Sequence, residues 1–188
     1  MTSIELFAGG GGLALGLEKA GFKHILLNEY DKHAANTLKT NRNWNVINDD
    51  IRNIDFTPYK GQVDLLSGGI PCQAFSYAGK QLGFEDTRGT LFFEFARALK
   101  ETEAKMFLIE NVKGLFTHDN KRTMQTMFHV LEDLGYKIFK PQVLDASYYN
   151  VPQRRERLFI VGIRKELPRT FEYPEKQERT VLKDALLK

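Results

Sequence analysis

Short apolar runs alternate with segments of helical period from the N-terminus to Gly135. Runs of strand length lie at residues 3–7, 24–28, 46–47, 63–67 and 106–109. Apolar residues at helical spacing lie between and after them, at residues 13–20, 31–40, 90–100 and 120–134. Gly21 is placed to end the first of these helices, and Asp31 is placed to cap the second. This alternation predicts an α/β fold with a doubly wound parallel sheet.

The rhythm changes after Gly135. Two strand-like runs, Tyr136 to Leu144 and Leu158 to Arg164, follow one another with no helical pattern between them. They predict an antiparallel strand pair at one edge of the sheet. Residues 165–188 are rich in charge and contain two prolines, and residues 180–187 fit a short amphipathic helix. We therefore expect a domain over residues 1–164 and a tail over residues 165–188.

Composition narrows the class of protein. A chain of 188 residues with 42% hydrophobic and 27% charged content fits one globular domain. The net charge of +3 permits a nucleic-acid partner without requiring one. The N-terminus has no basic and apolar leader, and no run reaches the roughly 18 apolar residues of a membrane helix. These features predict an intracellular protein with no membrane partner.

The chain has a single cysteine, Cys72. One cysteine forms no internal disulfide, and without a Cys/His cluster the sequence predicts no metal site. Cys72 is then either a small buried apolar residue or a reactive group. It lies in the segment from Gly68 to Ser76, directly after a predicted buried strand. In open α/β sheets, ligands and chemistry gather at the carboxyl ends of the strands.

A glycine loop, Phe7 to Gly12, follows the first strand and opens a helix, which indicates a nucleotide-like ligand. Gly9, Gly11 and Ala14 satisfy a loose dinucleotide fingerprint, and Glu29 lies where an acidic residue takes ribose hydroxyls. An NAD-dependent oxidoreductase is therefore one alternative, and a turn that only packs strand on helix is another. Asp50, after the third strand, fits an adenine contact or an exposed loop carboxylate.

Four segments together resemble the motifs of DNA cytosine-5 methyltransferases, in the same order. They are residues 4–22, Pro71-Cys72-Gln73, Glu110-Asn111-Val112 and Gln153-x-Arg155-x-Arg157. The likeness spans residues 3 to 164, and four ordered matches arise by chance far less often than one. It implies a Rossmann-like fold of S-adenosylmethionine-dependent methyltransferases, with S-adenosyl-L-methionine as cofactor and double-stranded DNA as substrate.

The chemistry of that family explains the residue types. Carbon 5 of cytosine is a poor nucleophile, so a thiolate, here Cys72, adds to carbon 6 and prepares the ring for methylation. Glu110 is expected beside Cys72, as a carboxyl kept neutral by burial that donates to ring nitrogen N3. The resemblance places Arg157 at the cytosine O2 and Arg155 in support of the catalytic loop, with Glu156 facing outward. The alternatives are a salt-bridged strand-end glutamate and a solvated basic edge strand.

The resemblance assigns the remaining site residues. It assigns to the cofactor Phe7, Ala8, Gly9, Gly11, Gly12, Leu13, Glu29, Tyr30, Asp50, Ile51, Pro71 and Leu91. It assigns to the substrate Gln73, Ser76, Lys80, Asn111 and Gln153. The target base must be flipped out of the duplex at a cost of about a few kcal/mol, and the loop of residues 74–88 is expected to close on the DNA, with Lys80 at a phosphate.

The family continues into a target-recognition domain, a glycine-asparagine motif and a terminal helix, none of which these 188 residues contain. We therefore expect a second polypeptide that supplies them in a heterodimer, within a restriction–modification system of the bacterial cytosol. A truncated fragment or a degenerate gene product would lack the same segments. A non-catalytic module that binds S-adenosylmethionine or a partner, and an enzyme acting on cytosine in transfer RNA, stay open as alternative functions.

Overall fold

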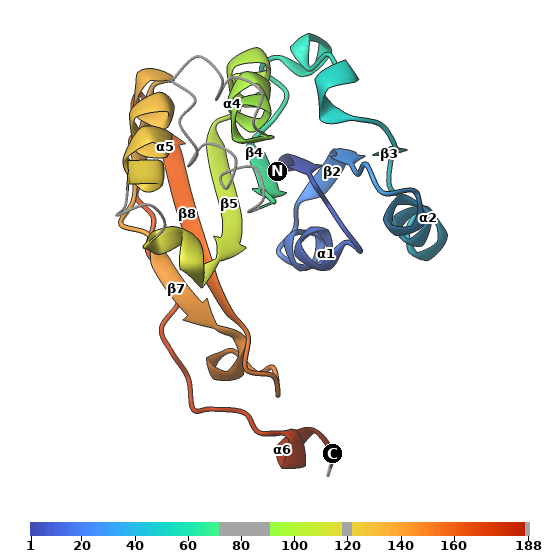
Figure 1. Ribbon diagram of the computed structural model, residues 1–188, viewed down its shortest axis with the longest axis vertical. Coiled ribbons are helices and arrows are strands. Elements are labelled where there is room, and N and C mark those ends of the chain that lie inside the picture. The colour runs from blue at the N-terminus through green and yellow to red at the C-terminus, as the bar shows by residue number, and fades with distance from the viewer. Residues whose placement is uncertain (72–90, 118–121, 187–188) are drawn as a thin grey trace.

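A computed structural model describes residues 1–71, 91–117 and 122–186 (Figure 1). The expected nucleophile Cys72, the substrate residues Gln73, Ser76 and Lys80, and the expected closing loop lie outside the described residues. Among the residues that are described, no helix is long and apolar enough to cross a membrane.

The elements follow the predicted alternation. The amino-terminal half contains β1 (Thr2–Leu6), α1 (Gly12–Lys19), β2 (Lys23–Asn28), α2 (Lys32–Asn41), β3 (Val46–Ile47), the 3-10 helices η1 (Ile51–Asn53) and η2 (Thr57–Tyr59), and β4 (Leu65–Gly69). After them come α4 (Leu91–Thr102), β5 (Met106–Val112), η4 (Lys113–Phe116), α5 (Arg122–Asp133), β6 (Tyr136–Ile138), β7 (Gln142–Asp145), η6 (Ala146–Tyr148), β8 (Glu156–Arg164) and α6 (Leu182–Leu186).

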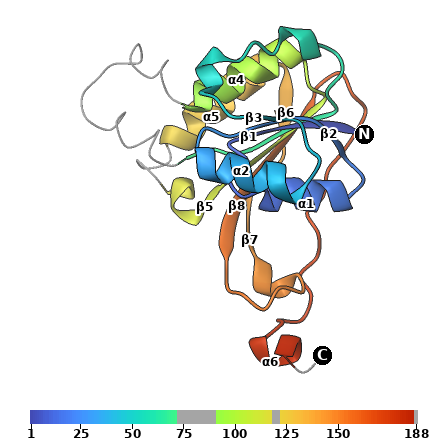
Figure 2. The ribbon, with the colours of Figure 1, turned by 90° about the vertical axis from the view of Figure 1, so that its right-hand side faces the viewer.

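The described strands form one sheet in the order β3-β2-β1-β4-β5-β8-β6, with β7 also paired to β8. The first five are parallel, and β8 runs antiparallel to β5, β6 and β7. Seen along the sheet, α4 and α5 lie on one face and α1 and α2 on the other (Figure 2). The doubly wound α/β fold is thus confirmed, and the carboxyl ends of β1, β2, β4 and β5 meet at one edge.

Local signals explain two of the helix ends. The Asp31 side chain accepts a hydrogen bond from the Ala34 N–H at 2.8 Å, which confirms it as the N-cap of α2. Gly21 adopts a left-handed φ of 87° just after α1, where a glycine ends a helix at little cost.

The antiparallel edge differs from the prediction in two respects. The expected strand from Tyr136 to Leu144 is two strands, β6 and β7, because Pro141 between them has no N–H to donate to the ladder with β8. The strand expected to stop at Ile109 continues to Val112, because β8 pairs alongside it as far as the Val112–Arg157 pair. Glu110 therefore lies inside β5, opposite Phe159, and does not close the strand.

The buried apolar residues form two clusters, a large one that includes residues of α4 and α5 and a smaller one that includes Ala14 of α1 and Leu38 of α2. On the α4 and α5 side, the buried ring of Phe107 makes edge contacts with Phe95 and Tyr136, at centroid distances of 6.5 and 5.2 Å. Gly162 on β8 lies under the same ring, since a Cβ there would approach Phe107 Cε1 to 2.1 Å. Packing of this kind fixes β8 against β5 and so fixes the registers of Glu110 and Arg157.

The tail after β8 packs on the domain before it leaves it at α6 (Figure 1). The Tyr173 hydroxyl donates to the Phe159 carbonyl at 2.9 Å, and burial raises the pKa of Tyr173 to about 12. The Thr180 N–H donates to the Ser147 carbonyl at 2.8 Å. The tail therefore stabilises the segment between β7 and β8 through backbone hydrogen bonds. The expected helix is shorter than predicted and spans only Leu182–Leu186 in the described part.

Candidate active site

Two cavities lie at the carboxyl edge of the sheet. One, of about 450 Å³, is lined by Glu29 and Asp50 together with apolar side chains; we call it the Glu29 cavity. The other, of about 660 Å³, is lined by Glu110 and the glycine loop; we call it the Glu110 cavity. Phe7 and Gly69 line both, so the two cavities adjoin.

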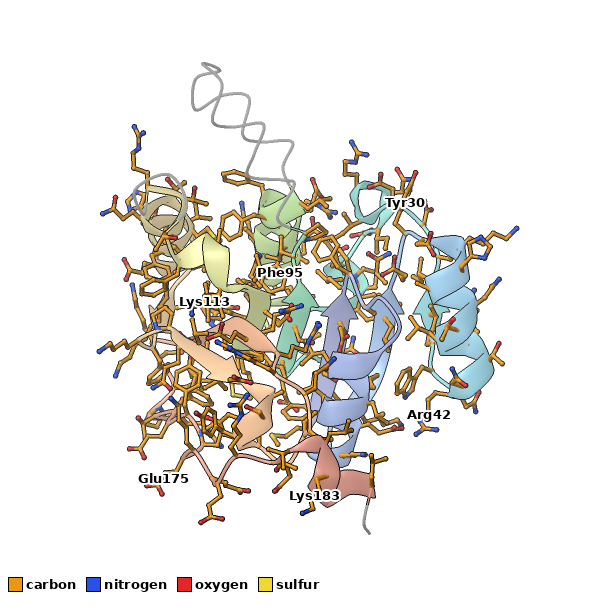
Figure 3. The ribbon with its side chains drawn as sticks, turned by 60° about the horizontal axis from the view of Figure 1, so that its bottom comes forward. Tyr30, Arg42, Phe95, Lys113, Glu175 and Lys183 are labelled. Atoms are coloured by element: carbon orange, nitrogen blue, oxygen red, sulfur yellow. The ribbon has the colours of Figure 1, made fainter. Side chains whose placement is uncertain are left out.

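Most of the predicted residues that are described line these cavities. The Glu29 cavity contains Phe7, Glu29, Tyr30, Asp50, Ile51, Pro71 and Leu91. The Glu110 cavity contains Phe7, Ala8, Gly9, Gly12, Leu13, Glu110, Gln153, Arg155 and Arg157. Figure 3 shows the labelled Tyr30 near the end of β2 and Lys113 near the end of β5, on opposite sides of the strand ends between them. Gly11 and Asn111 line neither cavity.

The glycine loop is built from backbone conformations that few residues adopt. Gly9 and Gly11 have φ angles of 54° and 85°, and Phe7 has a φ of 56°, which is unusual for a residue with a side chain. A Cβ on Gly11 would lie 2.6 Å from Leu38 Cδ2 and 3.0 Å from the Trp44 ring. Gly11 thus holds the loop against α2, which places the start of α1 at the Glu110 cavity.

Glu29 ties this loop to the end of β2. One carboxylate oxygen accepts the Gly9 N–H at 2.6 Å, and the other accepts the Asp31 N–H at 2.8 Å. Each oxygen keeps a further lone pair for a ligand hydroxyl, because a carboxylate has about four acceptor positions.

Asp50 is bound by its neighbour Arg52. The guanidinium donates to both carboxylate oxygens, with Nη2–Oδ2 at 2.5 Å and Nε–Oδ1 at 3.0 Å. These bonds lower the pKa of Asp50 to about 2. Asp50 is therefore a fixed carboxylate at the cavity and not a loose loop residue.

Glu110 lies between two arginines. Its Oε1 is 2.9 Å from Arg157 Nε and 4.0 Å from Arg155 Nη2, and about a quarter of its side chain (23%) is exposed. The surroundings of Glu110 are polar on this side, because the arginines of β8 reach across to it. Glu156 points away and pairs with Lys113 at 3.0 Å, as the alternation along β8 predicts.

The end of β4 lies directly beside Glu110. Gly69 pairs with Glu110 in the sheet, and a Cβ on Gly69 would lie 3.3 Å from Glu110 Oε2. The buried Asn111 amide donates to the Ile70 carbonyl at 2.8 Å. Asn111 therefore fixes the chain two residues before Cys72, and its predicted contact with substrate stays a prediction.

Glu5 is a residue of this site that the sequence analysis missed. It lies on β1 and lines the Glu110 cavity, yet only 1% of its surface is exposed, and its Oε2 has no hydrogen-bond partner among the described residues. Burial raises the pKa of Glu5 to about 8, although a hydrogen bond from the Ala14 backbone opposes the shift. The available signal was a glutamate inside the apolar run Ile4-Glu5-Leu6.

Comparison with known proteins decides the family. The model of the C-5 cytosine-specific DNA methylase family matches residues 1–188. The chain belongs to this family. The NAD-dependent oxidoreductase alternative is thereby removed, and S-adenosylmethionine is the cofactor of the family, as predicted.

The sequences of known methyltransferases support the same family. The Type II methyltransferase M.Eco47II of Escherichia coli is 59% identical over 191 residues, which is 100% of this chain and 46% of the relative. M.PspPI of a Psychrobacter species is 66% identical over 165 residues, which is 87% of this chain and 40% of the relative. The chain thus spans less than half the length of these methyltransferases.

Solved structures agree on the fold. One described as a DNA modification methyltransferase encoded within an E. coli prophage has a TM-score of 0.81 at 29% identity, over 99% of this chain and 54% of its own. The DNMT2 of Spodoptera frugiperda has a TM-score of 0.73 at 23% identity, over 94% of this chain and 54% of its own. The Rossmann-like methyltransferase fold is confirmed.

Proposed function

We propose that this chain transfers a methyl group from S-adenosylmethionine to carbon 5 of cytosine in double-stranded DNA, with Cys72 as nucleophile. The observation that carries the proposal is the position of Glu110. It stands between Arg155 and Arg157, beside the end of β4 that leads into Cys72, and in a cavity that adjoins the Glu29 cavity.

The residues present fit the cofactor. When bound, S-adenosylmethionine supplies an electrophilic methyl group on a sulfonium. Glu29 offers free lone pairs to the ribose hydroxyls, and Phe7, Ile51 and Leu91 supply the apolar walls for an adenine. Glu5 lines the adjoining cavity, where the amino-acid end would carry an ammonium group, and its Oε2 has no partner among the described residues. Glu5 would accept from that ammonium, because a buried acceptor without a partner is costly.

The cytosine chemistry falls to residues around the Glu110 cavity. The Cys72 sulfur adds to carbon 6 while Glu110 delivers a proton to ring nitrogen N3, and Arg157 stabilises the Glu110 carboxylate that remains. Carbon 5, now nucleophilic, takes the methyl group, and S-adenosylhomocysteine is released. Loss of the carbon 5 proton to a base then expels the Cys72 thiolate and restores the aromatic ring, and the N3 proton returns to the Glu110 carboxylate.

Arg157 has a second task in this proposal. Its Nε forms an ion pair with Glu110 Oε1 at 2.9 Å and its Nη1 donates to the Glu156 carbonyl, which fixes the guanidinium in the cavity. The remaining N–H groups can donate to the cytosine O2. Arg155, with about half of its side chain exposed (52%), lies further out, and we assign to it the support of the segment that carries Cys72.

The relatives are Type II methyltransferases, which supports a restriction–modification setting for the proposed activity. More than half of each relative lies outside the matched segment. We propose that site-specific methylation by these 188 residues needs an equivalent recognition segment. That segment would contact base edges, while the base enters the Glu110 cavity by flipping.

The proposal is tested by methyl transfer from labelled S-adenosylmethionine to duplex DNA, with and without the part of M.Eco47II outside the matched segment added in trans as the candidate recognition segment. We expect label on carbon 5 of cytosine, at one sequence context, only when both are present. Label on RNA in preference to DNA would move the substrate to transfer RNA. Saturable cofactor binding without transfer in any mixture would favour the non-catalytic alternative. Robust site-specific transfer by these 188 residues alone would overturn the need for that segment.

A further inference from the structure

An arginine that the motifs do not account for stands at the polar edge of the Glu29 cavity. Arg52 lines this cavity together with Asp50 and grips both oxygens of the Asp50 carboxylate. The Arg52 backbone N–H also donates to Asp50 Oδ1 at 3.0 Å. Three donors from one residue thus converge on one carboxylate.

The ion pair is not needed to hold the turn in which it lies. Arg97, on α4, donates to the carbonyls of Ile51 and Ile54, both at 2.9 Å, and so anchors η1 from its other side. Arg97 is itself held by Glu94 at 2.7 Å and by Glu101 at 3.0 Å. The Arg52 side chain is 63% exposed, and exposed ion pairs add little to stability. Stabilisation of the turn is therefore not a sufficient explanation for the Asp50–Arg52 ion pair.

Counting lone pairs shows what the pair presents to a ligand. Asp50 Oδ1 accepts two hydrogen bonds, from the Arg52 backbone and Nε, and is fully used. Asp50 Oδ2 accepts one, from Nη2, and keeps one acceptor position. Because the carboxylate is ionised at neutral pH, this position accepts and never donates.

We propose that Arg52 is the positioning residue for adenine recognition: it holds Asp50 so that Oδ2 accepts one N–H of the 6-amino group. A purine without that amino group would leave this acceptor facing an apolar ring and bind more weakly. The proposal rests on adenine occupying the Glu29 cavity. It goes beyond that assignment by making the selectivity for a 6-amino purine depend on a residue outside the family motifs.

The test compares two ligands by calorimetry: S-adenosylhomocysteine and its analogue that lacks the 6-amino group. For the wild-type chain we expect the amino group to improve affinity about tenfold, as for a hydrogen bond to a charged group. In Arg52→Met this ratio should fall to about twofold, through weaker binding of S-adenosylhomocysteine alone. Asp50→Asn should lower the ratio similarly, and the double variant should lower it no further, because both act through one contact.

Arg42→Met is the matched control. Arg42 forms a similarly exposed ion pair with Glu18 at 3.3 Å but lines neither cavity, so its removal should leave the ratio at the wild-type value. Equal weakening of both ligands in Arg52→Met, or an unchanged ratio, would overturn the positioning role. Failure of the wild-type chain to bind S-adenosylhomocysteine would instead overturn the cofactor assignment on which the role rests. Thermal unfolding of each variant separates these results from misfolding.

Discussion

Glu5 makes a sharp prediction about stability, because a carboxyl is held in the core with one oxygen unpartnered among the described residues. Glutamine has nearly the same shape as glutamic acid, but it does not ionise. The pKa of Glu5 is raised from 4.5 to about 8 in the folded chain, mainly by burial. In the unfolded chain the carboxyl is exposed to water and has its ordinary pKa.

The size of the effect follows from this difference. Between pH 4.5 and 8 the folded state keeps a proton that the unfolded state has released, so the free energy of unfolding falls as the pH rises. Each pKa unit corresponds to about 1.4 kcal/mol, and the full shift to about 5 kcal/mol. The stabilisation is complete below pH 4.5, is lost progressively through the range, and changes no further above pH 8.

The assay is urea unfolding of the wild type and of Glu5→Gln at four pH values from about 5 to 8. Relative to the variant, the wild type should lose about 3 to 4 kcal/mol across this range. A constant offset from the unpartnered Gln amide cancels in this comparison. Glu18→Gln, which removes an exposed carboxylate on α1, should give a curve parallel to the wild type. Parallel curves for Glu5→Gln as well would refute the buried-carboxyl reasoning.

Three further predictions concern the site and the core. In a calorimetric titration, Glu5→Gln should lower the affinity for S-adenosylhomocysteine about tenfold. It should leave the affinity for 5′-methylthioadenosine, which lacks the amino-acid end, unchanged; an equal loss of affinity for both ligands would contradict the contact between Glu5 and the ammonium group. Glu110→Gln should lower the methylation rate at least about a hundredfold while cofactor affinity stays constant in the same titration; parallel losses would make Glu110 structural. Gly162→Ala should lower the free energy of unfolding by about 1–3 kcal/mol in urea unfolding, because its Cβ would overlap the confined Phe107 ring. A change below about 0.5 kcal/mol, the size of a neutral surface substitution, would mean that the ring moves freely.

Much of the fold was predictable because local rules and the global fold agree. The apolar runs, the Asp31 cap and Gly21 each identified an element boundary from its own chemistry. The extension of β5 to Val112 was not predictable in this way, since it depends on pairing with β8 far along the chain. The break at Pro141 could have been predicted from its missing N–H.

The site was predictable to the extent that it consists of motifs. The motifs brought Glu29 and Asp50 to one cavity and Glu110, Arg155 and Arg157 to the other. Sequence spacing gave no sign that Arg52 holds Asp50, because that pair forms through the η1 turn. The bond from Asn111 to Ile70 was hidden for the same reason, because it joins two segments that are adjacent only in the folded sheet.

The most direct measurement of the central claim is covalent trapping on DNA that contains 5-fluorocytosine at the target position. With S-adenosylmethionine and the recognition segment present, methyl transfer proceeds, but fluorine at carbon 5 leaves no proton to remove, so the Cys72 thiolate is not expelled. We expect a stable protein–DNA adduct in a denaturing gel, attached at Cys72 by peptide mapping, and none with Cys72→Ala. An adduct that still forms with Cys72→Ala, or methylation of ordinary DNA by that variant, would contradict the account.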